Sequence, residues 1–111
     1  MHIRNLQAIN AARAVEWHAP QNAPWTLGDW GNAMAGECGE ACNVIKKIRR
    51  IECGLKPPDN LEALREHLAE ELADTLLYLL LVAEAADLDM QAAVRDKFNS
   101  VSGKEGFPQR L

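Results

Sequence analysis

The sequence predicts an all-α protein, an antiparallel four-helix bundle that self-associates. Three observations support this class. Apolar residues recur at the three- and four-residue spacing of a helix. Ile3, Leu6 and Trp17 belong to such a series in the first stretch. Segments rich in proline, glycine or aspartate separate the helical stretches. No stretch shows the strict alternation of polar and apolar residues that is typical of a half-buried strand.

The first two predicted helices cover residues 3–17 and 26–51, with a proline-containing loop over residues 18–24 between them. Thr26 stands at the start of the second helix and Asp29 follows three residues later, which is the spacing of a capping box. The second helix also contains several glycines, which allow another backbone or a ligand to approach closely.

The third and fourth predicted helices cover residues 59–86 and 89–101, with Asp59 and Asp89 as their expected N-caps. Residues 76–82 are apolar on nearly every face, and a helix of this kind is buried on all sides. One small chain cannot surround such a helix. We therefore expect a homodimer or a homotetramer.

Composition predicts a single domain over residues 1–111, because 48% hydrophobic content is ordinary for a globular protein of this length. The net charge of -4 offers no basic excess for nucleic acid or an anionic membrane, so neither is an expected partner. The longest apolar run is far shorter than the roughly 20 residues of a membrane span. Residues 1–15 lack the pattern of a signal peptide. We expect a cytoplasmic protein with reduced cysteines.

Two acidic pairs carry most of the chemical information. Glu37 and Glu40 lie in the second predicted helix, and Glu71 and Asp74 lie in the third. Residues three apart share one face of a helix, so each helix presents two carboxylates side by side. Carboxylates in otherwise apolar segments need a cationic partner. Four oxygen donors from two antiparallel helices predict a Mg²⁺ site, with Mn²⁺ as a substitute.

Other classes of protein are weighed against this prediction. A di-iron helical bundle would use Glu-x-x-His pairs, and no histidine here follows a glutamate at that spacing. A zinc site could use Cys38 and Cys42, but no third soft ligand lies nearby in the sequence. A non-catalytic helical metal-binding or interaction protein would explain an exposed apolar face, but not acids in the middle of two facing helices.

The segments 36–41, 45–47 and 70–79 together resemble the MazG-like nucleoside triphosphate pyrophosphohydrolases, relatives of the dimeric dUTPases and of dCTP pyrophosphatase. That family pairs E-x-x-E on one helix with E-x-x-D on the next, and the resemblance extends over residues 17–107. It implies Mg²⁺-dependent hydrolysis of a nucleoside triphosphate to the monophosphate and pyrophosphate. A deoxynucleotide with a pyrimidine base is the preferred substrate.

The same resemblance implies roles for individual residues. The metal ligands would be Glu37, Glu40, Glu71 and Asp74, and Glu37 or Glu40 is also our expected proton acceptor for the attacking water. Many relatives carry a lysine on the fourth helix and an asparagine four residues later. Here the residue four positions after Lys97 is Val101, and the residue four positions before Asn99 is Arg95. Either Lys97 or Asn99 therefore keeps the role that it has in those relatives, or the register of the fourth helix has moved. The expected substrate contacts are Trp17, His18, Trp30, Lys47 (with Lys46 as its neighbour), Tyr78, Lys97 and Asn99.

Overall fold

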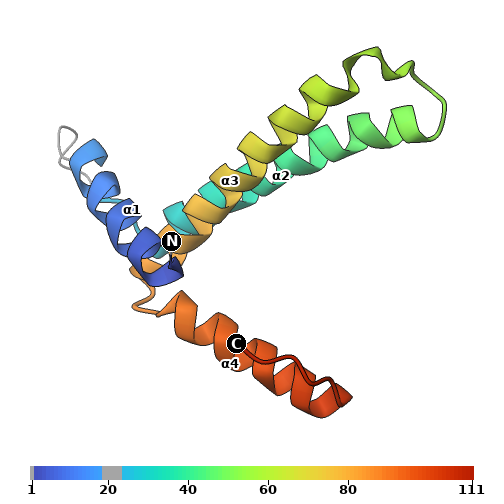
Figure 1. Ribbon diagram of the computed structural model, residues 1–111. Helices are drawn as coiled ribbons and strands as arrows, with labels where there is room; N and C mark the ends of the chain where they lie inside the picture. Colours follow the sequence, from blue (N-terminus) through green and yellow to red (C-terminus); the bar gives the residue numbers. More distant parts are fainter. Residues whose placement is uncertain (1, 19–23) are drawn as a thin grey trace.

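The computed structural model describes residues 2–18 and 24–111, and these residues form an all-helical structure (Figure 1). The α-helices are α1 (Ile3–His18), α2 (Leu27–Glu52), α3 (Leu61–Ala85) and α4 (Met90–Glu105), and a short 3-10 helix, η2 (Pro58–Asn60), precedes α3. The predicted all-α class and its four helices are confirmed. The loop predicted over residues 18–24 falls mostly outside the described residues.

Two of the predicted caps are present. Thr26 Oγ1 accepts a hydrogen bond from the Asp29 N–H at 3.3 Å, and Asp29 Oδ2 accepts one from the Thr26 N–H at 2.8 Å. This reciprocal pair satisfies backbone donors that have no partner within the helix. At the start of α4, Asp89 Oδ1 accepts from the Ala92 N–H at 3.1 Å. Both caps therefore begin their helices within one residue of the predicted position.

The other helix ends differ from the prediction. Asp59 does not cap α3, because it lies inside η2, and the N-cap is Asn60 without a side-chain hydrogen bond. The preceding residue Pro57 is extended, and a proline disfavours the helical conformation in the residue before it. The fourth helix continues four residues beyond the predicted end at residue 101 and stops at Gly106, whose φ of 76° suits glycine.

Helices α2 and α3 form a long antiparallel hairpin, which is the main packed unit of the molecule (Figure 1). The two helices run side by side and turn back at residues 53–60, at the end of the hairpin farthest from α1 (Figure 1). Buried apolar side chains lie on both helices, Ala41 and Val44 on α2 and Leu80 and Ala83 on α3. The hairpin therefore brings the two acidic segments of the sequence opposite each other.

Helix α1 packs against α3 and is tied to the α3–α4 turn by polar contacts. The buried side chain of Gln7 donates to the Leu88 carbonyl at 2.7 Å and accepts from the Met90 N–H at 3.2 Å. Nearby, Arg4 forms an ion pair with Asp89 at 2.6 Å. These contacts hold the start of α1 beside the start of α4. None of the helices in the described part of the chain is long and apolar enough to span a membrane.

The chain is much more open than a compact domain of its length. Its radius of gyration is 17.6 Å, whereas a compact chain of this size has a value of about 13 Å. Helix α4 projects away from the hairpin (Figure 1). Only a small apolar core is buried among the described residues, namely Ala41, Val44, Leu80 and Ala83. A single chain thus leaves most of its apolar helix faces uncovered.

Candidate active site

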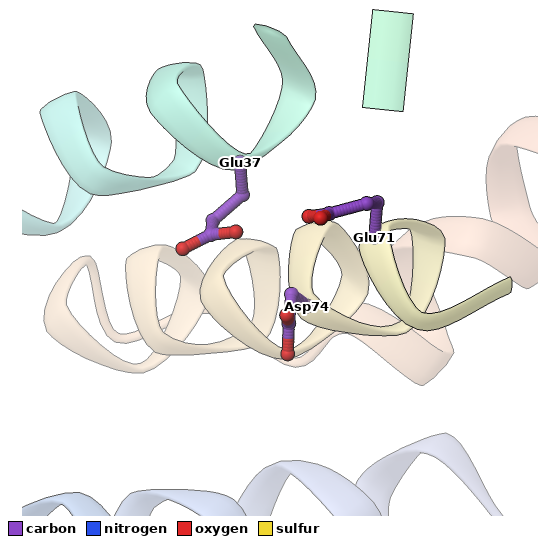
Figure 2. Close-up of side chains that lie close together, drawn as sticks. All are labelled: Glu37, Glu71 and Asp74. Carbon is purple, nitrogen blue, oxygen red and sulfur yellow. The ribbon is translucent and has the colours of Figure 1, made fainter. Parts of the chain in front are cut away.

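Three of the four predicted acids meet between α2 and α3. Each of Glu37, Glu71 and Asp74 offers a carboxylate oxygen, and these oxygens lie within 4.8 Å of one another. Figure 2 shows Glu37 reaching from α2 toward the carboxylate of Glu71 on α3, with Asp74 further along α3. The i, i+3 spacing places the two α3 acids on one face of that helix. The predicted convergence of these three side chains is therefore present.

The carboxylate of Glu71 is held on one side and unpartnered on the other. His67 Nε2, one turn earlier on α3, donates to Glu71 Oε1 at 2.8 Å. Glu71 Oε2 is buried and has no hydrogen-bond partner among the described residues. A buried carboxylate oxygen without a donor is costly, because it has lost its water and gained nothing in return. A cation bound between the helices would satisfy this oxygen.

Glu40 contacts the group without joining it. It lies outside the set of three converging oxygens, but it shares a hydrogen bond with Glu37 when Glu37 is protonated. The pKa of Glu37 is raised, first by partial burial, then by the negative charge of Glu40 and Asp74, by the hydrogen bond to Glu40 and by the charge of Glu71. Burial and neighbouring negative charges both disfavour the ionised form of a carboxyl group. The cluster is thus short of positive charge.

The donor set suits a hard divalent cation. Carboxylate oxygens from two helices, without a cysteine or histidine nitrogen in the converging group, are the ligands that Mg²⁺ and Mn²⁺ prefer. The zinc alternative has no support among the described residues, because Cys38 and Cys42 are exposed free thiols and neither belongs to this group. The residues present therefore fit Mg²⁺ as the sequence predicts.

An aromatic cavity adjoins the acids. It has a volume of about 330 Å³, and Asp74 and Tyr78 form part of its wall. Three of the predicted substrate contacts, Trp17, His18 and Trp30, also line it. The rings lie close together, with centroid distances of 5.3 Å for His18 and Trp30 and 6.1 Å for Trp30 and Tyr78. The structure thus brings four of the expected substrate contacts to one cavity beside Asp74.

Sequence reasoning missed one aromatic ring and two polar side chains of this cavity, namely Trp25, Arg13 and Asn10. The ring of Trp25 lies 4.5 Å from that of Trp30 and 4.8 Å from that of His18, so it completes the aromatic wall. The sequence signal for Trp25 was its position directly before Thr26, the N-cap of α2, because the start of the helix fixes the direction of the chain at that residue. Arg13 and Asn10 gave no signal of their own, because polar side chains usually face solvent.

The predicted lysine contacts lie elsewhere. Lys47 is ten residues after Glu37 on α2, roughly 15 Å along the helix axis. It lines a separate hollow of about 290 Å³ near the hairpin turn, together with Arg50 and Lys56. Lys46 is exposed on the same helix. Within one chain, neither lysine is brought to the acids.

Two expected contacts on α4 are also distant from the acids, because that helix points away from the hairpin (Figure 1). Lys97 is exposed. Asn99 uses its side-chain amide on the C-terminal segment: it donates to the Leu111 carbonyl at 3.2 Å and accepts from the Leu111 N–H at 2.9 Å. In this chain Asn99 therefore holds the last residue, Leu111, against α4.

Comparison with known families now bears on this geometry. Residues 27–106 match the MazG nucleotide pyrophosphohydrolase domain. The chain belongs to the MazG family. The matched segment is most of the chain and contains all four acids, whereas α1 and its cavity residues lie before it. No curated protein and no solved structure gave a significant match. The resemblance carried by the acidic pairs is confirmed, and membership of the MazG family indicates a nucleotide pyrophosphohydrolase.

Proposed function

We propose that this MazG protein hydrolyses a nucleoside triphosphate, preferably a deoxynucleotide, to the monophosphate and pyrophosphate with Mg²⁺ as cofactor. The observation that carries the proposal is the contact between two features: a carboxylate cluster that lacks positive charge and an aromatic cavity that shares Asp74 with it. A triphosphate needs both a cation for its charge and a surface for its base. Few other small ligands would use the two features together.

Glu37, Glu71 and Asp74 would hold the cation, and Glu71 Oε2 is the oxygen with the most to gain from it. When bound, Mg²⁺ would neutralise phosphate charge, acidify a water molecule and stabilise the leaving pyrophosphate. His67 keeps Glu71 in place from the side opposite the free oxygen. The chain thereby supplies a preorganised set of anions to which a Mg²⁺–triphosphate complex can be added.

Glu40 is our candidate for the general base. It stands beside Glu37 but outside the converging group, so its carboxylate is not committed to the cation. It would accept a proton from the water that attacks the α-phosphorus in line with the leaving pyrophosphate. The i, i+3 spacing places Glu40 on the same face of α2 as Glu37, beside the cluster.

The aromatic cavity would hold the nucleobase. Stacking of a base on aromatic side chains contributes on the order of 1–3 kcal/mol and tolerates any base. Trp25, Trp30 and His18 provide ring faces, and Tyr78 lies on α3 one turn after Asp74, between the rings and the acids. A nucleotide lying in this cavity would direct its phosphates toward Asp74.

We also propose that the protein acts as a homodimer or homotetramer. Leu72 and Leu76 on α3 are 51% and 45% exposed, and Phe98 on α4 is 41% exposed. These are large apolar side chains, and the described residues of the chain leave them about half exposed. A second copy would bury them, and it could bring the α4 residues Lys97 and Asn99 toward a neighbouring site.

The decisive experiment is a product analysis. The purified protein is incubated with each of the common NTPs and dNTPs and Mg²⁺, and the products are separated by ion-exchange chromatography. A monophosphate and pyrophosphate in equal amounts would support the proposal. A diphosphate with orthophosphate would contradict it. Absence of any hydrolysis together with specific Mg²⁺ binding would favour a non-catalytic metal-binding protein.

A further inference from the structure

A buried polar pair lies in the wall of the aromatic cavity, on the side formed by α1. Asn10 is only 4% exposed, and its Nδ2 donates to the carbonyl oxygen of Leu77 on α3 at 2.8 Å. Its Oδ1 accepts a hydrogen bond from Arg13 Nη2 at 3.0 Å. Asn10 and Arg13 both line the cavity. One buried amide thus connects the arginine to the backbone of α3.

This arrangement fixes the orientation of the amide. Leu77 offers a carbonyl oxygen, which only accepts, so the amide nitrogen of Asn10 must face it and the amide oxygen must face Arg13. The guanidinium is therefore anchored through one nitrogen. In the described part of the chain it makes no ion pair and no other hydrogen bond. An arginine carries five N–H donors and no acceptor, so most of its donors stay available to a ligand.

We propose that Arg13 is a specificity-determining residue that reads the edge of the nucleobase held in the aromatic cavity. A guanidinium fork pairs best with two adjacent acceptors, as with O6 and N7 of guanine. Cytosine offers the same chemistry at N3 and O2. Adenine and uracil or thymine do not offer two adjacent acceptors: adenine N1 and N7 lie beside the N6 amino donor, and O2 and O4 of uracil or thymine lie beside the N3–H donor. The site should therefore prefer cytosine and guanine, whichever the shape of the cavity admits. This inference rests on the proposed nucleotide substrate.

The position of the pair in the chain agrees with such a role. The metal-binding acids lie inside the segment that matches the MazG domain, residues 27–106, whereas Asn10 and Arg13 lie before it. The reaction and the recognition of the base would then be carried by separate parts of the chain. Asn10 acts as a positioning residue, because its amide nitrogen is engaged by the Leu77 carbonyl and its amide oxygen by Arg13.

The test uses tryptophan fluorescence of the full chain. All three tryptophans of the sequence, Trp17, Trp25 and Trp30, line the cavity, so occupancy should change the signal directly. Nucleosides of the different bases are titrated in one series, and inorganic tripolyphosphate with Mg²⁺ in another. Wild-type protein should bind cytidine or guanosine more tightly than adenosine and uridine by about fivefold or more.

Three variants separate the explanations. Arg13→Gln should abolish the preference among nucleosides and leave tripolyphosphate binding unchanged. Arg13→Lys should behave like Arg13→Gln, because a lysine keeps the charge but lacks the fork. Arg65→Gln, an exposed arginine on α3 that does not line the cavity, is the matched control and should bind like wild type. Circular dichroism of each variant verifies that it is folded.

Other results would overturn the inference. Equal loss of binding for all nucleosides in Arg13→Gln would mean that Arg13 supports the cavity as a whole and does not read the base. Loss of tripolyphosphate binding in this variant would mean that Arg13 contacts phosphate. An unchanged nucleoside preference in Arg13→Gln, or no such preference in wild type, would mean that it does not read the base. None of these titrations needs hydrolysis, so a protein that binds as expected but releases no pyrophosphate would contradict the proposed activity alone.

Discussion

His67 and Glu71 form a hydrogen bond of 2.8 Å across one turn of α3, and it leaves the other carboxylate oxygen of Glu71 buried and unpartnered. The histidine therefore sets the direction of a carboxylate that belongs to the acidic cluster. Residues that hold a metal ligand in place commonly matter to affinity nearly as much as the ligand itself.

His67→Ala should weaken binding of Mn²⁺ by about tenfold or more, because Glu71 loses the donor that orients it. Isothermal titration of the folded variant with Mn²⁺ measures the change. Glu66→Gln, the exposed neighbour, is the matched control and should leave affinity unaltered. Wild-type affinity in a folded His67→Ala protein would show that the histidine has no part in the site.

Removing a single charge from the cluster should have opposite effects on metal binding and on metal-free stability. Glu71→Gln and Asp74→Asn keep the shape of the side chain but lose a ligand charge, so Mg²⁺ binding and pyrophosphate release should fall strongly. Without metal, the same variants should melt at a higher temperature than wild type, because fewer like charges repel.

Glu70→Gln provides the control for this series. Glu70 adjoins Glu71 in sequence but is exposed and lies outside the converging group. It should change neither metal binding nor metal-free melting appreciably. If Glu70→Gln and Glu71→Gln gave the same results, the effect would be one of general surface charge.

The raised pKa of Glu37 predicts how the metal-free protein responds to pH. Its cause is first partial burial and then the charges and hydrogen bond of neighbouring acids. A raised native pKa means that Glu37 favours the folded state below its ordinary pKa of 4.5, and that this contribution is lost as pH rises through the native pKa. Over the same pH range, the affinity for Mg²⁺ should increase, because the Glu37 carboxyl group loses its proton.

Thermal melts from below pH 4.5 to neutrality, recorded once without metal and once with Mg²⁺, measure both effects. Glu37→Gln cannot ionise, so its metal-free melting temperature should depend less on pH than that of wild type. If the melting temperatures of wild type and Glu37→Gln changed equally with pH, groups other than Glu37 would cause the loss of stability at higher pH.

The start of α2 should contribute measurably to stability. Thr26→Ala removes the oxygen that accepts from the Asp29 N–H and should lower the free energy of unfolding by about 1 kcal/mol. Thr26→Ser keeps that oxygen and should remain near wild type. Urea denaturation monitored by circular dichroism distinguishes the two. Equal stability of the alanine and serine variants would rule out a contribution from the cap.

Self-association should depend on the apolar face of α3. The double variant Leu72→Gln, Leu76→Gln should be monomeric in light scattering at a concentration where wild type is a dimer or tetramer. Leu55→Gln alters a 73% exposed leucine in the turn of the hairpin and should leave the assembly intact. Wild-type protein that is a monodisperse monomer at micromolar concentration would contradict the proposed assembly.

The fold and the convergence of Glu37, Glu71 and Asp74 were predictable because local rules decide them. Glu71 and Asp74 share a face through helix geometry alone, and a short turn places Glu37 opposite them. Glu40 shows where such rules stop. It has the same spacing from Glu37 as Asp74 has from Glu71, but it lies outside the converging group, because side-chain direction depends on packing across the hairpin.

The cavity was only partly predictable, for a different reason. Trp17, His18 and Trp30 were found through resemblance, whereas Arg13 acquires its role from Asn10 and a backbone carbonyl on another helix. That contact joins residues far apart in the sequence, and no periodicity reveals it. The start of α3 was missed because the prolines before it form a 3-10 turn that contains the expected cap Asp59. The C-terminal end of α4 was missed because the helix continues through Gly103 to Glu105.

The acids lie on the α2–α3 hairpin, whereas part of the aromatic cavity lies on α1, and this separation has a consequence for the order in which the chain folds. All the acids come from α2 and α3, so closing one short connection, residues 53–60, is enough to bring them together. Contacts close in sequence form early, whereas α1 must find a helix some sixty residues downstream. We therefore expect the hairpin to form first and α1 to dock last. A divalent cation would then stabilise the early unit, and a nucleotide would stabilise the late one.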